Sequence, residues 1–106
     1  MNLGEILKTE VNSGMINFEN HNADNGFFGD TLNEIEKGLK YRNYEPLGIC
    51  KHVPFPCSCA GNSIAFVYKY DEEVYWCHMP ETYWFHLLRE TYGYNEADKI
   101  FESIIL

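Results

Sequence analysis

Basic residues are scarce in this sequence, and it contains no long apolar run. Eight lysines and arginines stand against sixteen acidic residues, which gives a net charge of −8. A surface that binds nucleic acid needs concentrated positive charge, so this composition argues against direct binding to DNA or RNA. It also disfavours attraction to an anionic membrane. No apolar stretch approaches the roughly 20 residues that span a bilayer.

A secretory signal is also missing from the N-terminal residues. The segment MNLGEILKTEV has no basic start followed by an apolar core and small residues, which is the pattern of a signal peptide. We therefore expect a cytoplasmic protein. In that compartment thiols stay reduced, so the four cysteines are not expected to form disulfides.

The common catalytic signatures are absent as well. The sequence has no phosphate-binding loop, no dinucleotide fingerprint, no His-Glu-x-x-His and no nucleophile elbow. Three consecutive carboxylates occur at Asp71, Glu72 and Glu73, but at the end of a hairpin they would be solvated and would keep ordinary pKa values. The sequence favours a protein that is not an enzyme and has no cofactor.

Cysteines and histidines around the segment PFPCSCAGN (54–62) leave an alternative open. Four zinc ligands are available among Cys50, His52, Cys57, Cys59, Cys77 and His78. The paired Cys-x-x-Cys spacing typical of structural zinc is missing, and neighbouring strand residues such as Cys77 and His78 point to opposite faces.

A reactive thiol is a further alternative for the same segment. Cys57 or Cys59 would be the nucleophile and His52 or His78 its base. However, the loop leads into a strand, whereas a helix N-terminus would lower a thiol pKa. The simplest interpretation makes the thiols incidental, with Cys50 and Cys77 packed as small buried hydrophobic residues.

Apolar and aromatic residues are plentiful. They make up 45% and 16% of the 106 residues, which predicts one folded domain spanning residues 1–106 with an aromatic core. Trp76, Trp84 and Phe85 are expected in that core. The clearest strands are 63–70 and 73–79, which form a hairpin across Asp71-Glu72 with Val67 opposite Trp76 and Phe66 opposite Cys77.

The rest of the chain predicts helices and short extended segments. Residues 15–18 are expected to form a short strand and 44–50 to be extended, with loops at 19–29 and 51–62. Helices are expected over 3–11, from a cap at Thr31 or Asp30 to near Tyr41, over 80–92, and after a cap at Asn95. The fold class is therefore α+β, a small antiparallel meander with the hairpin at its centre, packed against three or four short helices.

Charge is distributed unevenly along the chain. Residues 71–102 carry eight acids against Arg89 and Lys99, a local charge of −6, whereas residues 37–51 are at +3. One interpretation is an ordinary solvated surface. The other is an acidic face that docks on a basic protein, because opposite charge steers association. Aromatic rings beside carboxylates would anchor such a contact. The candidate partner-binding residues are Asp71, Glu72, Glu73, Glu81, Glu90, Tyr68, Tyr70, Tyr75 and Tyr83.

The order of features over about residues 27–92 resembles the SUKH superfamily, which contains many bacterial toxin-immunity proteins. The matching features are PLG (46–48), AGN (60–62), the strand IAFVYKY, an acidic turn, the strand EVYWC and the helix YWFHLLRE. This resemblance implies a small α+β inhibitor that binds one toxin, often a nuclease, and carries no chemistry of its own.

Composition and resemblance together predict an acidic immunity protein that neutralises a nucleic-acid-handling toxin. A phage-encoded inhibitor of a nucleic-acid-guided defence complex, of the anti-CRISPR kind, is the close alternative, with carboxylates imitating phosphates. A small zinc-binding protein or thiol enzyme using Cys50, Cys57, Cys59 and Cys77 is the alternative from another class.

Overall fold

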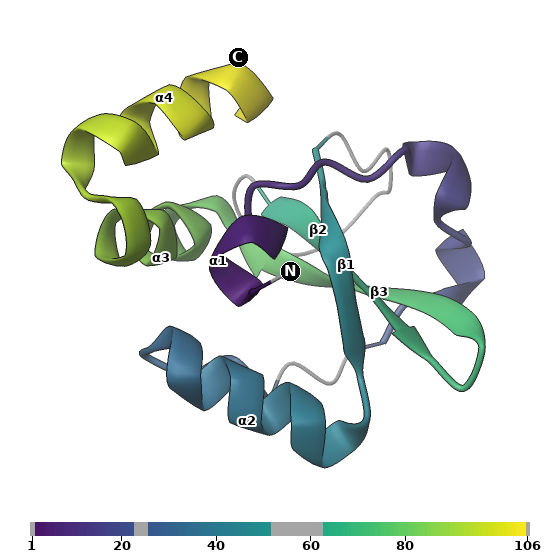
Figure 1. Ribbon diagram of the computed structural model, residues 1–106. Helices are drawn as coiled ribbons and strands as arrows, with labels where there is room; N and C mark the ends of the chain where they lie inside the picture. The colour runs from purple at the N-terminus through teal and green to yellow at the C-terminus, as the bar shows by residue number, and fades with distance from the viewer. Residues whose placement is uncertain (1, 23–25, 52–62, 106) are drawn as a thin grey trace.

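A three-stranded antiparallel sheet forms the centre of the protein in the computed structural model, which describes residues 2–22, 26–51 and 63–105 (Figure 1). The strand order is β1-β2-β3, with helices packed on the sheet, so the predicted α+β class is confirmed. The elements are α1 (Leu3–Ile6), the 3-10 turns η1 (Ser13–Met15) and η2 (Phe18–Asn20), α2 (Leu32–Arg42), β1 (Glu45–Cys50), β2 (Ser63–Tyr70), β3 (Glu73–Pro80), α3 (Glu81–Tyr92) and α4 (Tyr94–Ile105).

The β2–β3 hairpin has the predicted register. Val67 lies opposite Trp76 and Phe66 lies opposite Cys77. Strand β1 pairs with the other side of β2, and a bulge between Pro46 and Gly48 interrupts the ladder. A proline is tolerated here because β1 is an outer strand of the ladder.

The two faces of the sheet carry separate apolar clusters. Alternation along β2 sends Ile64, Phe66 and Tyr68 to the face that packs against the helices, where Trp84 and Leu87 of α3 are also fully buried. The opposite face carries Ala65 and Val67 with Trp76, and the N-terminal segment covers it through Val11 and Ile16. Both faces are thus covered, one by helices and one by irregular chain.

The first helix is much shorter than the predicted span of 3–11. Asn2 caps α1, since its side-chain oxygen accepts from Glu5 N at 2.9 Å, and the helix ends at Ile6. Beyond it the chain pairs with β1, because Val11 N donates to Ile49 O at 2.7 Å and Ile49 N donates to Thr9 O at 2.8 Å. The prediction was wrong for residues 7–11 because these main-chain bonds replace further helical turns.

The predicted strand at 15–18 is also wrong. Met15 ends η1, and Phe18 begins η2. Each turn starts at an asparagine whose side chain accepts a main-chain N–H two residues on, Asn12 from Gly14 N at 2.8 Å and Asn17 from Glu19 N at 3.0 Å. Such side-chain caps favour tight turns over a ladder.

The N-terminal segment then reaches β3. Asn22 N donates to Trp76 O at 2.9 Å, and Asn20 Nδ2 donates to Val74 O at 3.0 Å. Figure 1 shows this segment passing from α1 around the sheet toward β3. One stretch of chain therefore bonds to both outer strands.

The remaining helices lie close to their predicted positions. Thr31 caps α2 by accepting from Glu34 N at 3.2 Å, and the helix ends at Arg42, followed by Asn43 with a left-handed φ of 59°. Gly93 separates α3 from α4, and α4 begins at Tyr94, so Asn95 lies inside the helix and does not precede it. Within the described ranges, no helix combines the length and apolar character required to cross a bilayer.

Candidate protein-binding surface at the hairpin tip

The turn between β2 and β3 presents three carboxylates. Asp71 and Glu72 both have positive φ, 50° and 68°, as a two-residue type I′ hairpin turn requires. Neither is the glycine or asparagine that usually occupies these positions, yet the turn closes with Glu73 directly opposite Tyr70. All three acidic side chains are exposed. We call Tyr70, Asp71, Glu72, Glu73 and Tyr75 the hairpin tip.

Two tyrosines accompany these carboxylates on the helix-facing side of the hairpin. Tyr70 exposes 41% of its surface, and Tyr75 is half-buried. Their rings are nearly perpendicular, at 82° with centroids 6.3 Å apart. Tyr75 Oη donates to Glu73 Oε2 at 3.1 Å. This hydrogen bond is the main cause that raises the pKa of Tyr75, followed by desolvation and then by the charges of Glu73 and Asp71. The tip is therefore a region of negative potential.

Tyr68 must be removed from the predicted contact residues. Its side chain has no solvent exposure and belongs to the core. Tyr44 stacks on it at 4.4 Å between ring centroids, and Tyr75 stacks on it at 6.1 Å. Strand alternation places Tyr68 with Phe66 on the packed face, so it supports the neighbouring tyrosines from below and exposes no surface of its own to solvent.

A hollow of about 390 Å³ opens beside these rings. Its lining residues come from the N-terminal segment, the residue before β1 and the hairpin: His21, Asn22, Tyr44, Tyr68, Tyr70 and Tyr75. Asn22 Nδ2 donates to Tyr44 Oη at 3.2 Å, which joins two of these segments. We call this the tyrosine hollow. Sequence reasoning missed Tyr44, His21 and Asn22 because nothing in the sequence indicated that these distant segments meet.

Three further predicted contact residues lie away from the tip. Glu81, Tyr83 and Glu90 belong to α3. This helix begins at the far end of β3, and the seven residue steps from Glu73 to Pro80 span about 23 Å. Tyr83 Oη donates to Gly29 O at 2.5 Å, and burial raises the pKa of Tyr83 to about 12. Tyr83 thus holds the segment before α2. The structure does not bring the predicted residues together into one face.

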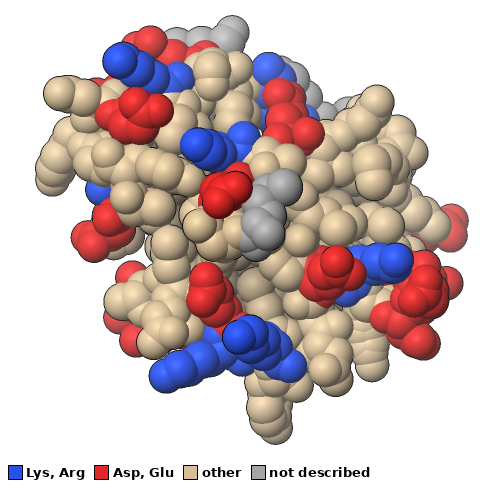
Figure 2. All heavy atoms as spheres, in the orientation of Figure 1, with Lys and Arg blue, Asp and Glu red and all other residues tan. Residues whose placement is uncertain are grey.

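Charges of both signs alternate on the face drawn in Figure 2, where basic side chains lie among the carboxylates. At the hairpin, Lys69 Nζ is 3.6 Å from Glu72 Oε2, although both side chains are solvated. On this view, therefore, the carboxylates do not form a continuous acidic face.

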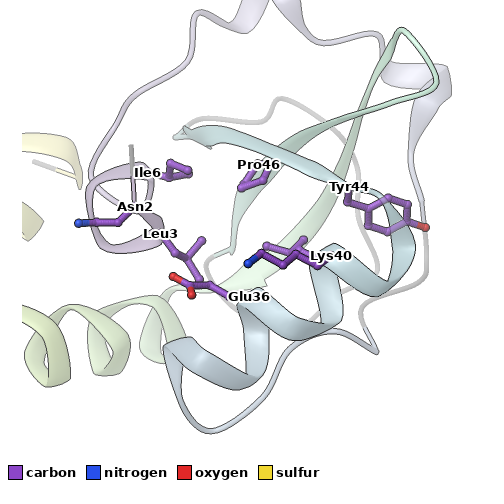
Figure 3. Close-up of a pocket in the computed structure, with 8 residues that line it drawn as sticks. Asn2, Leu3, Ile6, Glu36, Lys40, Tyr44 and Pro46 are labelled. Carbon is purple, nitrogen blue, oxygen red and sulfur yellow. The ribbon is translucent and has the colours of Figure 1, made fainter.

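A second hollow, of about 280 Å³, lies between α1, α2 and β1 (Figure 3). Leu3, Ile6 and Leu39 contribute apolar side chains to it. Figure 3 shows Glu36 and Lys40 rising from α2 on the side that faces α1. Tyr44 lines this hollow and the tyrosine hollow, so the two sites adjoin.

The described cysteines are buried. Cys50 and Cys77 are free thiols with 3% and 1% exposure, and burial raises the pKa of the Cys50 thiol, with a smaller contribution from Glu10. Both packing predictions are confirmed. His78 lies on the other face of β3 from Cys77, against Trp76 and His21.

The zinc and thiol alternatives depend on residues outside the described part. His52, Cys57 and Cys59 fall in 52–62, which the structure does not describe. Within the described ranges, no three Cys, His, Asp or Glu side chains are grouped so as to hold a metal ion.

Comparison of the chain with protein families, with characterised proteins and with solved structures gave no significant match. The resemblance to the SUKH superfamily therefore remains an expectation from the sequence.

Proposed function

We propose that this protein is a non-catalytic inhibitor that binds a cationic surface of a nucleic-acid-handling protein through its hairpin tip. The observation that carries the proposal is the concentration of Asp71, Glu72 and Glu73 beside Tyr70 and Tyr75 at one end of the sheet. Tyrosine rings supply contact area at low entropic cost, and exposed carboxylates supply steering and register.

The chemistry of the tip fits recognition better than catalysis. Its carboxylates are solvated at a turn, and a general acid or base needs a pKa shifted by burial or by a close partner. Exposed charges next to aromatic rings instead resemble the rim and anchors of a protein interface. A partner that handles nucleic acid presents the complementary positive surface.

Within this class we favour a toxin-immunity protein, as the SUKH resemblance implies. The toxin would be a nuclease whose substrate-binding surface is basic, and occupation of that surface would exclude the nucleic acid. A phage-encoded inhibitor of a nucleic-acid-guided complex would use the same tip on a different partner. Inhibition of the partner's nuclease activity is therefore the property to measure.

The experiment compares two variants with the same loss of charge. Asp71→Asn/Glu72→Gln/Glu73→Gln neutralises the tip, and Glu96→Gln/Asp98→Asn/Glu102→Gln neutralises three exposed acids on α4. Nuclease toxins encoded beside the gene are the partners to test, by inhibition of DNA or RNA cleavage and by association rate at several salt concentrations.

We expect the tip variant to associate at least tenfold more slowly at low salt and the wild-type rate to fall as salt rises. The α4 variant should behave as wild type. Equal losses in both variants, or an association rate that is independent of salt, would contradict the proposal.

A further inference from the structure

Tyrosine rings border the tyrosine hollow on several sides and leave it open to solvent. Tyr70 meets Tyr75 at 82° and Tyr44 at 63°, with centroids 6.3 Å and 5.5 Å apart. The stack of Tyr44 on the buried Tyr68 fixes the floor. Rings inclined steeply to one another around a solvent-accessible space can present more than one aromatic face to a cation.

The electrostatics of the hollow favour positive charge. Glu73 lies directly opposite Tyr70 and bonds Tyr75 Oη through one carboxylate oxygen. None of the described lining residues is a lysine or an arginine. The nearest basic residue along β2, Lys69, alternates to the other face of the sheet and lies beside Glu72.

We propose that the tyrosine hollow receives the guanidinium group of one arginine side chain from the partner. This inference rests on the proposed function, because it assigns a contact within the same tip. Arginine fits better than lysine because its planar group stacks on a ring and donates hydrogen bonds sideways to a carboxylate. Here the ring is Tyr70 or Tyr75 and the carboxylate is that of Glu73. A volume of about 390 Å³ is adequate for one such side chain.

The test uses three blocked peptides with the intact protein: acetyl-Gly-Arg-Gly-amide, its lysine analogue and its citrulline analogue. Citrulline has the shape of arginine without the charge. Binding is followed by NMR of the tyrosine ring resonances at millimolar peptide. We expect the arginine peptide to bind at least fivefold more tightly than the citrulline peptide, which corresponds to about 1 kcal/mol. The shifts should centre on Tyr70 and Tyr75.

Variants locate the site. Tyr70→Leu should abolish the shifts, and Tyr70→Phe should retain them, since only the ring face is needed. Glu73→Gln should weaken binding about fivefold. Tyr41→Leu is the control, because Tyr41 is 86% exposed and does not line the hollow.

Equal binding of the arginine and citrulline peptides, absence of binding, or shifts that survive Tyr70→Leu would each overturn this inference. Tighter binding of the lysine peptide would overturn the choice of arginine. These outcomes are distinct from failure of the proposed function, which is judged by nuclease inhibition with the two charge-neutralised variants. A tip that inhibits the toxin but ignores arginine would leave the proposed function intact and remove only this contact.

Discussion

The indole Nε1 of Trp84 donates a hydrogen bond to the main-chain carbonyl of Leu7, 2.7 Å away, inside the core. Both side chains are almost completely buried, at 0% and 1% exposure. The bond joins α3 to the residue that follows α1, which is 77 positions earlier in the chain. It fixes the N-terminal segment against the helix layer, where apolar contacts alone would leave its orientation less defined.

Replacement of Trp84 by phenylalanine should destabilise the protein by about 2–3 kcal/mol. The variant leaves the Leu7 carbonyl buried without its donor and leaves space in the core. Urea unfolding measures the loss. The exposed neighbour His86→Gln is the control and should stay within about 0.5 kcal/mol of wild type. A similarly small change for Trp84→Phe would show that the hydrogen bond and the ring volume matter little.

Glu72→Gly should stabilise the hairpin. A residue with a side chain at φ 68° is strained by about 1 kcal/mol, and glycine relieves that strain at some entropic cost. We expect a net gain of about 0.5–1 kcal/mol in the free energy of unfolding. Glu72→Gln retains the strain and removes only the charge, so it should be close to neutral. Equal effects of the two substitutions would assign the gain to charge.

Gly48→Ala should be severely destabilising, by about 2–4 kcal/mol. Gly48 has a φ of 156°, and an added Cβ would lie 2.5 Å from Thr9 O and 2.7 Å from Val11 Cγ2. Relief of the clash would break the pairing of Thr9–Val11 with Ile49. Gly14→Ala, which meets only the Asn12 side chain at 3.3 Å, is the milder comparison in the same thermal-unfolding assay. Tolerance of alanine at 48 would contradict this close approach.

The stability of the protein should fall as the pH drops below about 6.5, in part because of His78. Desolvation by burial, followed by the nearby His21, lowers the pKa of His78 below its ordinary value of 6.5. The unfolded chain therefore takes up this proton at a higher pH than the folded protein does. The contribution is complete above pH 6.5 and is lost as the pH falls toward the folded pKa. Thermal melts between pH 5 and 7.5 should show a shallower decline for His78→Gln than for wild type. An unchanged slope would remove His78 as the cause.

The buried thiols should be unreactive until the protein unfolds. In a Cys57→Ser/Cys59→Ser variant, Cys50 and Cys77 are the remaining thiols, and a chromogenic disulfide reagent should modify them only in urea. Rapid modification in native buffer would contradict their burial.

Elemental analysis of the wild type and of the Cys57→Ser/Cys59→Ser variant tests the zinc alternative. About one zinc ion per wild-type chain that is lost in the variant would support that alternative.

The local sequence pattern predicted the hairpin correctly. At the N-terminus the predicted helix was too long, because residues 9–11 pair with a distant strand. Alternating apolar residues in 63–70 and 73–79 with two residues between them leave one favourable register, and it is the observed one. In the first helix, Leu3, Ile6 and Leu7 indicate an apolar face at helical spacing. Nothing in that spacing reports that Thr9 and Val11 bond to Ile49, because a main-chain contact with a distant strand leaves no periodic signal.

The candidate site was likewise predictable only where it depends on local sequence. The carboxylates at 71–73 follow from the turn, since a two-residue connection must be exposed. The same alternation that placed Tyr68 beside Phe66 already indicated burial, so its role as a surface contact was inconsistent with the predicted strand. Tyr44 and His21 reach the hollow through tertiary folding, for which a single sequence gives no signal.

The main-chain bonds made by the N-terminal segment have a consequence for recognition. At Ile49 on one outer strand, and at Val74 and Trp76 on the other, carbonyl or amide groups that an incoming β-strand would use are already occupied. Augmentation of the sheet by a visiting polypeptide is therefore blocked at these points, as is stacking of copies edge to edge. At these positions a ligand protein can contact the sheet edges through side chains but not through main-chain pairing, so its selectivity there should change with substitutions of individual residues.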